Sequence, residues 1–89
     1  MISRDVEIIN RLGLHARAAA KLVDCAARFS SRLTITKASN TVDAKSIMSV
    51  MMLAAGKGTL VTLSADGSDE QAALEALTTL INNRFDEAD

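Results

Sequence analysis

The spacing of apolar residues changes between two periods along this chain, and that change constrains the fold more than any other feature. Apolar residues at Ile2, Val6 and Ile8 alternate with polar or charged ones, which predicts a first strand with one buried face. Over residues 16–28 the apolar residues follow a helical period instead. The same two patterns recur downstream and predict strands at 33–36, 41–44 and 59–65 and helices at 46–53 and from 68 onward.

The order of these segments predicts an α+β fold. Strands and helices mixed as β, α, β, β, α, β, α, with a tight turn at Ser39-Asn40, are expected to place three helices on one face of a four-stranded antiparallel sheet. A chain of 89 residues suffices for one such two-layer domain, which we expect to span residues 1–89.

The residue types within the helical segments predict which faces are buried and where the helices begin. The first helix is expected to bury a stripe of small residues, namely Ala16, Ala19, Ala20, Val23, Ala26 and Ala27. The last helix is expected to bury Ala73, Leu74, Leu77, Leu80 and Ile81. Ser46 is predicted to cap the second helix, and a glycine of Gly56-Lys57-Gly58 to end it in the left-handed conformation. Ser68-Asp69-Glu70-Gln71 has the pattern of a capping box, and the acidic tail Asp86-Glu87-Ala88-Asp89 is typical of a frayed end.

Composition excludes several classes of function. The net charge is −1 and aromatic residues make up 2% of the chain, so it lacks the basic surface and stacking side chains that nucleic-acid binding needs. The single cysteine, Cys25, rules out an internal disulfide and the usual multi-cysteine zinc patterns, and neither a metal nor a cofactor is expected. No apolar stretch is long enough to span a bilayer, and the first residues do not resemble a signal peptide. We therefore expect a cytoplasmic protein.

His15, the one histidine in the sequence, stands where the first strand gives way to the alanine-rich helix. The first N–H groups of a helix lack intrahelical acceptors and the helix dipole is positive there, so this position can bind an anion. Gly13 permits the close approach or positive φ that a bulky anion needs. Ala16 and Arg17 offer backbone N–H groups, and the Arg17 guanidinium can hold phosphate oxygens in a fork. A lone histidine is often only structural, but this one has anion-binding groups beside it.

Nucleophilic chemistry fits this arrangement best. No second histidine, no serine with a matching acid and no set of metal ligands accompanies His15, so general-base or metal-assisted hydrolysis lacks its partners. An imidazole can accept a group covalently and hand it on. Because phosphoryl oxygens match the anion-binding start of a helix, a phosphoryl group is the best candidate for that cargo.

A second segment, Lys45-Ser46-Ile47-Met48, opens the short middle helix. By residue type Ser46 is first an N-cap, and regulatory phosphorylation is the alternative. The apolar residues Ile47, Met48, Met51 and Met52 exceed what one buried face of a two-turn helix needs. They are explained either as core filling or as a surface that docks partner proteins, for which methionine is well suited.

Both segments resemble the motifs of one family. Gly13-Leu14-His15-Ala16-Arg17-Ala18-Ala19 is similar to the active-site signature of HPr, the histidine-containing phosphocarrier of the bacterial phosphotransferase system (PTS). Residues 45–48 are similar to that family's second motif, whose serine is regulatory in many members. The resemblance covers nearly the whole chain, including the turn at 56–59 and the helix start at 69–73. Many members have proline where this chain has Ala18, and we expect alanine to keep the helix and add an N–H donor.

The resemblance implies an open-faced β-sandwich and a phosphocarrier that is not itself an enzyme. His15 would accept a phosphoryl group on Nδ1 from phosphoenolpyruvate by way of enzyme I and pass it to a IIA protein or domain. Arg17 would steady the group, the middle helix would join the docking surface, and HPr kinase/phosphorylase would be a candidate partner for Ser46. A monomer is expected, in sugar transport or in the nitrogen-related branch (NPr). The alternative is a regulatory module of the same fold that acts through Ser46; a small hydrolase lacks a second catalytic group.

Overall fold

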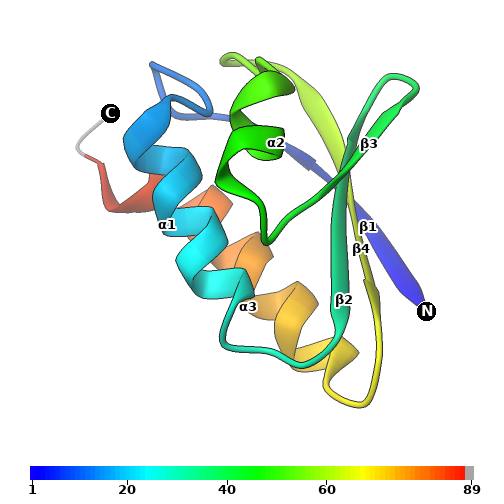
Figure 1. The fold of residues 1–89 in the computed structure, drawn as a ribbon. Coiled ribbons are helices and arrows are strands. Elements are labelled where there is room, and N and C mark those ends of the chain that lie inside the picture. Colours follow the sequence, from blue (N-terminus) through cyan, green and yellow to red (C-terminus); the bar gives the residue numbers. More distant parts are fainter. Residues whose placement is uncertain (88–89) are drawn as a thin grey trace.

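The protein folds as a sheet covered by helices on one face, as the order of apolar patterns predicts. A computed structural model describes residues 1–87 (Figure 1). Its elements are β1 Ile2–Glu7, α1 Ala16–Ala26, β2 Arg32–Lys37, β3 Asn40–Asp43, α2 Ile47–Met52, β4 Leu60–Asp66, α3 Glu70–Asn82 and a 3-10 turn, η1, Arg84–Asp86. The predicted α+β class and element order are confirmed, and η1 is an addition that the sequence pattern did not predict. No helix within residues 1–87 has the length and apolar character needed to cross a membrane.

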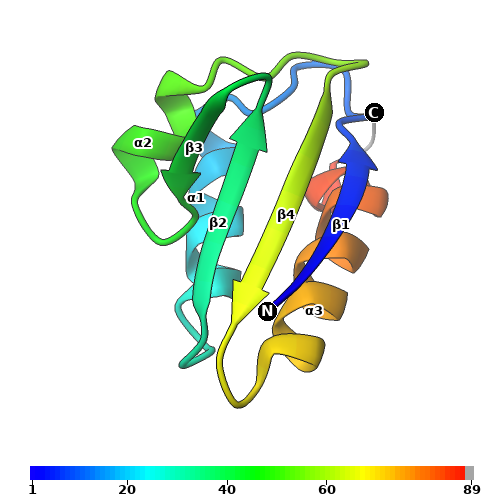
Figure 2. The ribbon, with the colours of Figure 1, turned by 90° about the vertical axis from the view of Figure 1, so that its right-hand side faces the viewer.

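The sheet is antiparallel, with the strand order β1-β4-β2-β3. β4 lies between β1 and β2, so that Val6 pairs with Val61 and Ile35 pairs with Leu63. These side chains belong to the hydrophobic core, because alternate residues of a strand point to the same face. Figure 2 shows the opposite face of the sheet without a helix in front of it. This open face, on which the hydroxyls of Ser3 and Ser64 are hydrogen-bonded at 3.0 Å, confirms the predicted one-sided architecture.

The buried face of α1 is rotated from the predicted stripe. Ala19 and Ala26 are buried as expected, but the helix also buries Ala18, Leu22 and Cys25. Predicted members at the two ends of the stripe, Ala16 and Ala27, are exposed. The physical reason is that Leu22 has far more apolar area to bury than an alanine, and the charged residues Arg17, Lys21 and Asp24 occupy the solvent-facing side of the helix. In α3 a similar correction applies, since Thr78 is buried and Leu80 is only half-buried.

The capping box predicted at residues 68–71 does not form. α3 has Asp69 as its N-cap residue, and the Asp69 side chain makes no capping hydrogen bond. Its carboxylate instead accepts hydrogen bonds from the backbone N–H groups of Ser30 and Ser31, both at 2.9 Å, and from the Ser31 hydroxyl. The carboxylate thus ties the start of α3 to the loop that follows α1. The local side-chain contact at this end of α3 is instead the Glu70 carboxylate, whose Oε1 accepts from Gly67 N–H at 3.1 Å.

We expect Asp69→Asn to destabilise the protein in a pH-dependent way. The Ser31 hydroxyl and the Ser30 and Ser31 N–H groups hold the pKa of the Asp69 carboxyl at about 2, below its ordinary 3.8. The ionised form therefore contributes stability that is complete above about pH 4 and is lost as the pH falls through about 2. Urea midpoints of wild type and Asp69→Asn should differ most near neutral pH and converge in that acidic window. Asp24→Asn, an exposed carboxylate on α1, is the control, and a constant difference across pH would contradict the assignment.

Two turns use alanine where the sequence suggested other residues. The β2–β3 turn is at Ala38-Ser39 rather than Ser39-Asn40, and Ala38 has φ 54°. After α2 it is Ala54, with φ 53°, that takes the left-handed conformation predicted for a glycine. Lys37 Nζ donates to the carbonyls of Leu53 and Ala54 at 3.0 and 3.2 Å. These bonds satisfy carbonyls at the end of α2, which offsets the strain of a left-handed alanine.

Candidate functional site

The loop that carries His15 is fixed by its neighbour in space, the segment between α2 and β4. Leu14 N–H donates to the Ala55 carbonyl at 2.9 Å, and Gly13 has φ +65°. A Cβ on Gly13 would lie 2.6 Å from the Ala55 carbonyl oxygen. The predicted positive φ at Gly13 is thus present, but the group that approaches it closely is the backbone of residues 55–56. Gly13 is required for packing that sets the direction of the chain into α1.

His15 is the N-cap residue of α1. Its backbone is extended, with φ −71° and ψ 176°, and its carbonyl accepts from Ala19 N–H at 2.8 Å. No side chain among residues 1–87 caps this end, and the first turn contains no acidic residue. The N–H groups at the start of α1 therefore have no acceptor within the helix, and no acidic residue of the first turn balances the positive end of the helix dipole. Alanine at position 18 leaves the helix intact, because it begins at Ala16 as predicted.

The imidazole of His15 contacts the end of the chain. Its Nε2 lies 2.5 Å from Glu87 Oε2, and the two side chains are 25% and 14% exposed. The other Glu87 oxygen, Oε1, accepts from Asn10 Nδ2 at 3.1 Å. Asn10 is fully buried and also donates from Nδ2 to the Gly13 carbonyl at 2.8 Å. The Glu87 carboxylate is therefore held by two groups that belong to the loop and N-cap before α1.

The prediction of a frayed acidic end is wrong as far as Glu87; residues 88 and 89 lie outside the part that the structure describes. Phe85 is fully buried in the core, and its carbonyl accepts from Lys21 Nζ of α1 at 2.6 Å. Arg84, Phe85 and Asp86 all have positive φ, between 54° and 61°. This conformation is unfavourable for non-glycine residues, and the burial of an aromatic ring offsets its cost. We call residues 84–87 the C-terminal strap.

The charges around Glu87 favour its ionised form. Burial raises the pKa of the Glu87 carboxyl, but the hydrogen bonds from Asn10 and His15 and the charges of His15 and Arg17 outweigh burial and hold the pKa below its ordinary value. Arg17 itself lies exposed in the first turn of α1. The structure thus brings His15, Arg17 and the start of α1 together, as the sequence suggested, and adds Glu87 and Asn10.

Most residues of the middle helix, α2, are exposed to solvent. Ser46 is its N-cap as predicted, with Oγ accepting from Ser49 N–H at 3.4 Å and donating to Ser49 Oγ at 3.0 Å. Val50 is the residue of α2 that is buried. The exposed apolar side chains are Ile47, Met48, Met51 and Met52, and Leu12 of the His15 loop is exposed as well. Met48, Met52 and Leu12 are more than 60% exposed, whereas Ile47 and Met51 are about 40% exposed, and we call these five residues the apolar patch. α2 packs against α1, so the patch belongs to the same part of the molecule as the start of α1.

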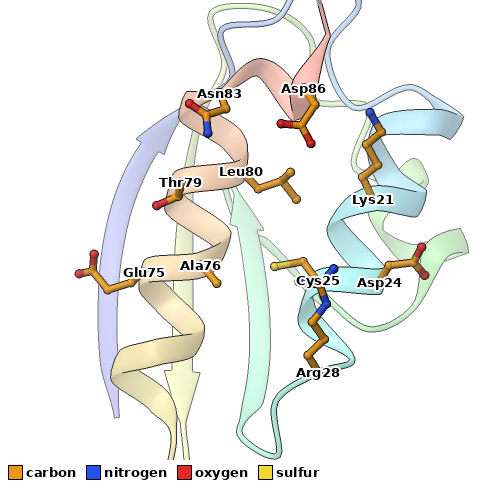
Figure 3. Close-up of a pocket in the computed structure, with 10 residues that line it drawn as sticks. All are labelled: Lys21, Asp24, Cys25, Arg28, Glu75, Ala76, Thr79, Leu80, Asn83 and Asp86. Atoms are coloured by element: carbon orange, nitrogen blue, oxygen red, sulfur yellow. The ribbon is translucent and has the colours of Figure 1, made fainter.

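A groove lies away from His15, between α1 and α3. It has a volume of about 630 Å³ and is lined by side chains of both helices, among them Lys21, Cys25, Arg28 and Glu75 (Figure 3). His15 does not line it. Burial raises the pKa of the Cys25 thiol, and the nearby charge of Arg28 lowers it only in part, so the thiol stays protonated at neutral pH. Within residues 1–87 no group of three or more His, Cys, Asp or Glu side chains is arranged to hold a metal ion.

Sequence reasoning missed Glu87 and Asn10. Glu87 lies 72 residues from His15, and a pair of polar residues at that separation leaves no periodic signal. Phe85 was the available clue, because it is one of two aromatic residues in the chain and follows directly on the last helix. A buried aromatic there predicts that the residues after it stay close to the core.

The chain is similar to known proteins over almost its whole length. Residues 2–83 match the family model described as the PTS HPr component phosphorylation site. The chain is 57% identical to phosphocarrier protein HPr of Cupriavidus necator over 89 residues, covering 100% of both chains, and 54% identical to that of Pseudomonas putida over 90 residues, again covering 100% of both.

Solved structures show the same fold. The crystal structure of HPr from Thermoanaerobacter tengcongensis superposes with a TM-score of 0.95 at 46% identity, over 98% of each chain. The crystal structure of the Bacillus subtilis catabolite repression protein Crh gives 0.76 at 46% identity, over 93% of this chain and 95% of that one. Crh is described there as a swapped dimer, and an HPr dimer is also known from T. tengcongensis, so the predicted monomer stays a prediction. The match over almost the whole chain shows that this protein belongs to the HPr family of PTS phosphocarrier proteins.

Proposed function

We propose that this protein carries a phosphoryl group on Nδ1 of His15, taken from phosphorylated enzyme I and given to a IIA protein or domain. The observation that supports this most directly is the state of the imidazole at the start of α1. Its Nε2 is hydrogen-bonded to the Glu87 carboxylate, whereas Nδ1 has no hydrogen-bond partner among residues 1–87. The nitrogen without a partner is the one that the family resemblance assigns as the acceptor. In this role the protein is a covalent substrate of its partners and not an enzyme.

The groups around Nδ1 suit a phosphoryl group. The backbone N–H groups of Ala16 and Arg17 lie at the positive end of α1, which no side chain of residues 1–87 caps, and would hold its oxygens. The exposed guanidinium of Arg17 is free to swing toward those oxygens and bind two of them in a fork. The neighbouring negative charge of Glu87 is engaged with Nε2 and Asn10, and is thus directed away from the incoming group.

The apolar patch would be the docking surface for the partners. Five exposed apolar side chains lie on α2 and the His15 loop, and methionine adapts to surfaces of different shape. A carrier that meets enzyme I and then a IIA protein needs such adaptability. We place this activity in the cytoplasm, in one domain spanning residues 1–89.

Ser46 is proposed as a regulatory site beside this surface. Its hydroxyl is half-buried and bonded to Ser49 at the start of α2, next to exposed Ile47 and Met48. A phosphoryl group on Ser46 would place a dianion at the edge of the apolar patch. It would then act by weakening docking, through desolvation and charge, while His15 remains intact.

The test is phosphorylation by a bacterial enzyme I with labelled phosphoenolpyruvate. Wild type should take up one phosphoryl group that is lost in acid and retained in base, as expected of a phosphorus–nitrogen bond. Ser46→Ala is the matched control: it loses a helix cap worth about 1 kcal/mol but should label fully. Absence of label with an enzyme I that phosphorylates another HPr would refute the proposal. Label that resists acid would point to a hydroxyl acceptor instead.

Arg17→Ala should fold normally and transfer poorly. The side chain is exposed, so its loss removes little packing. A charge-assisted hydrogen bond to a charged group contributes about 1.5–3 kcal/mol, which corresponds to roughly a 10- to 100-fold fall in the rate constant for acceptance. Rapid-quench kinetics with phosphorylated enzyme I measures it, and Arg17→Lys, which keeps the charge and loses the fork, should fall between the two. Equal rates for all three would remove Arg17 from the site.

A further inference from the structure

We propose that Glu87 is a positioning residue for the transfer: it keeps the His15 proton on Nε2, so that Nδ1 presents its lone pair, and it balances the charge of the ring once Nδ1 is phosphorylated. This inference rests on the proposed function of His15. It assigns a role to the C-terminal strap that goes beyond packing.

The geometry holds the carboxylate in one orientation. Oε2 lies 2.5 Å from His15 Nε2, and Oε1 accepts from Asn10 at 3.1 Å. Asn10 is fully buried and is held in turn by the Gly13 carbonyl. On the strap side, buried Phe85 and its bond from Lys21 fix the chain two residues before Glu87. A side chain fixed from both ends is placed to orient the ring that it contacts.

The chemistry of the pair decides which nitrogen reacts. An ionised carboxylate has no proton to donate and can only accept hydrogen bonds. The contact with Nε2 therefore requires a proton on Nε2, and a neutral imidazole has only one proton. Nδ1 is then left with a lone pair. Burial raises the pKa of the Glu87 carboxyl, but the hydrogen bond from Asn10 and the charge of Arg17 act against burial and favour the ionised, accepting form.

The same contact serves both directions of transfer. On acceptance, the Nδ1 lone pair forms a bond to phosphorus while the bond from phosphorus to the donor breaks, and that electron pair stays with the donor. The ring keeps its Nε2 proton and becomes a phosphoimidazolium with one positive charge, which the Glu87 carboxylate neutralises. On release, the phosphorus–Nδ1 bond breaks, its electron pair returns to Nδ1, and the ring is again neutral with its proton on Nε2.

The first test measures which ring nitrogen of His15 is protonated, and it needs no partner protein. Nitrogen-15 shifts of His15, recorded well above the titration range of imidazole, distinguish a protonated from an unprotonated ring nitrogen. Wild type should show a proton on Nε2 alone. Glu87→Ala should show a mixture of both neutral tautomers, and Glu87→Gln, whose amide oxygen can still accept from Nε2, should restore part of the bias. Asp86→Asn removes the same charge from the adjacent exposed residue and should match wild type. Unchanged shifts in Glu87→Ala would overturn the proposal.

The second test measures acceptance from phosphorylated enzyme I. We expect Glu87→Ala to lower kcat/KM roughly 10-fold, mainly through kcat because the strap is not part of the apolar patch, and Glu87→Gln to fall between the two. Faster acceptance in Glu87→Ala would show that the strap inhibits and would overturn the proposal. If wild type takes no label, the carrier function fails and the transfer part of this proposal fails with it. If wild type labels and the variants match it, only the role of Glu87 is lost.

Discussion

Replacing His15 with alanine should leave a folded protein that takes no phosphoryl group from enzyme I. The imidazole is a quarter exposed and, among residues 1–87, its hydrogen-bonded partner is Glu87. The ring lies outside the hydrophobic core, and Glu87 keeps its hydrogen bond from Asn10, so the urea midpoint should fall only modestly and the protein should stay folded. The acceptor atom itself is gone, so labelling should fall to background and not merely slow down. Intact-mass measurement after incubation with enzyme I and phosphoenolpyruvate is the assay.

A matched variant makes this result specific. Asn10→Ala and Glu87→Ala alter the surroundings of the ring but keep Nδ1, so both should still label, at a reduced rate. Residual label on His15→Ala with the same acid lability as wild type would mean that the acceptor lies elsewhere. Label on His15→Ala that survives acid would indicate hydroxyl phosphorylation, for which Ser46 is the candidate.

Phe85→Ala should be the most destabilising single change near the site. The ring is fully buried in the core, and truncation of a buried phenylalanine costs about 3–5 kcal/mol. That is a large share of the roughly 5–15 kcal/mol that stabilises a typical domain. Three consecutive residues with positive φ, Arg84 to Asp86, would also lose the anchor that offsets their conformation. Chemical denaturation followed by circular dichroism gives the free energy of unfolding.

Phe29→Ala is the control, since Phe29 is only partly buried and should cost less. Phe85→Ala should also release Glu87 from the His15 ring in the protein that remains folded, so it should reproduce the nitrogen-15 shifts of Glu87→Ala. A destabilisation below about 1 kcal/mol would contradict the anchoring role of Phe85. If Phe85→Ala loses the expected amount, about 3–5 kcal/mol, but the nitrogen-15 shifts of His15 do not change, packing of Phe85 stabilises the fold without holding Glu87 against His15.

In this site, contacts between neighbours in the chain could be predicted from the sequence, and contacts between distant residues could not. Arg17, Ala16 and His15 are adjacent in the chain, so their joint position at a helix start follows from the local change of period. The Glu87 contact depends on the whole fold, because 72 residues separate it from His15. Similarly, the exposure of Met48 and Met52 follows from how α2 is seated on the rest of the molecule, and pattern alone left core filling open.

The order of strands and helices, the one-sided sheet, the cap of α2 by Ser46 and the place of His15 at the start of α1 could all be predicted, because each depends on residues close together in the chain. Which face of α1 is buried depended on tertiary packing. Alanines occur both on the buried face and outside it, so the alanine pattern did not identify the face that Leu22 buries against the core. In place of the capping box predicted at residues 68–71, the tertiary structure has the Asp69 carboxylate bound to the backbone of Ser30 and Ser31. Above all it brought Glu87 to His15, since a buried ring at Phe85 gains more from the core than the strap loses by its strained backbone.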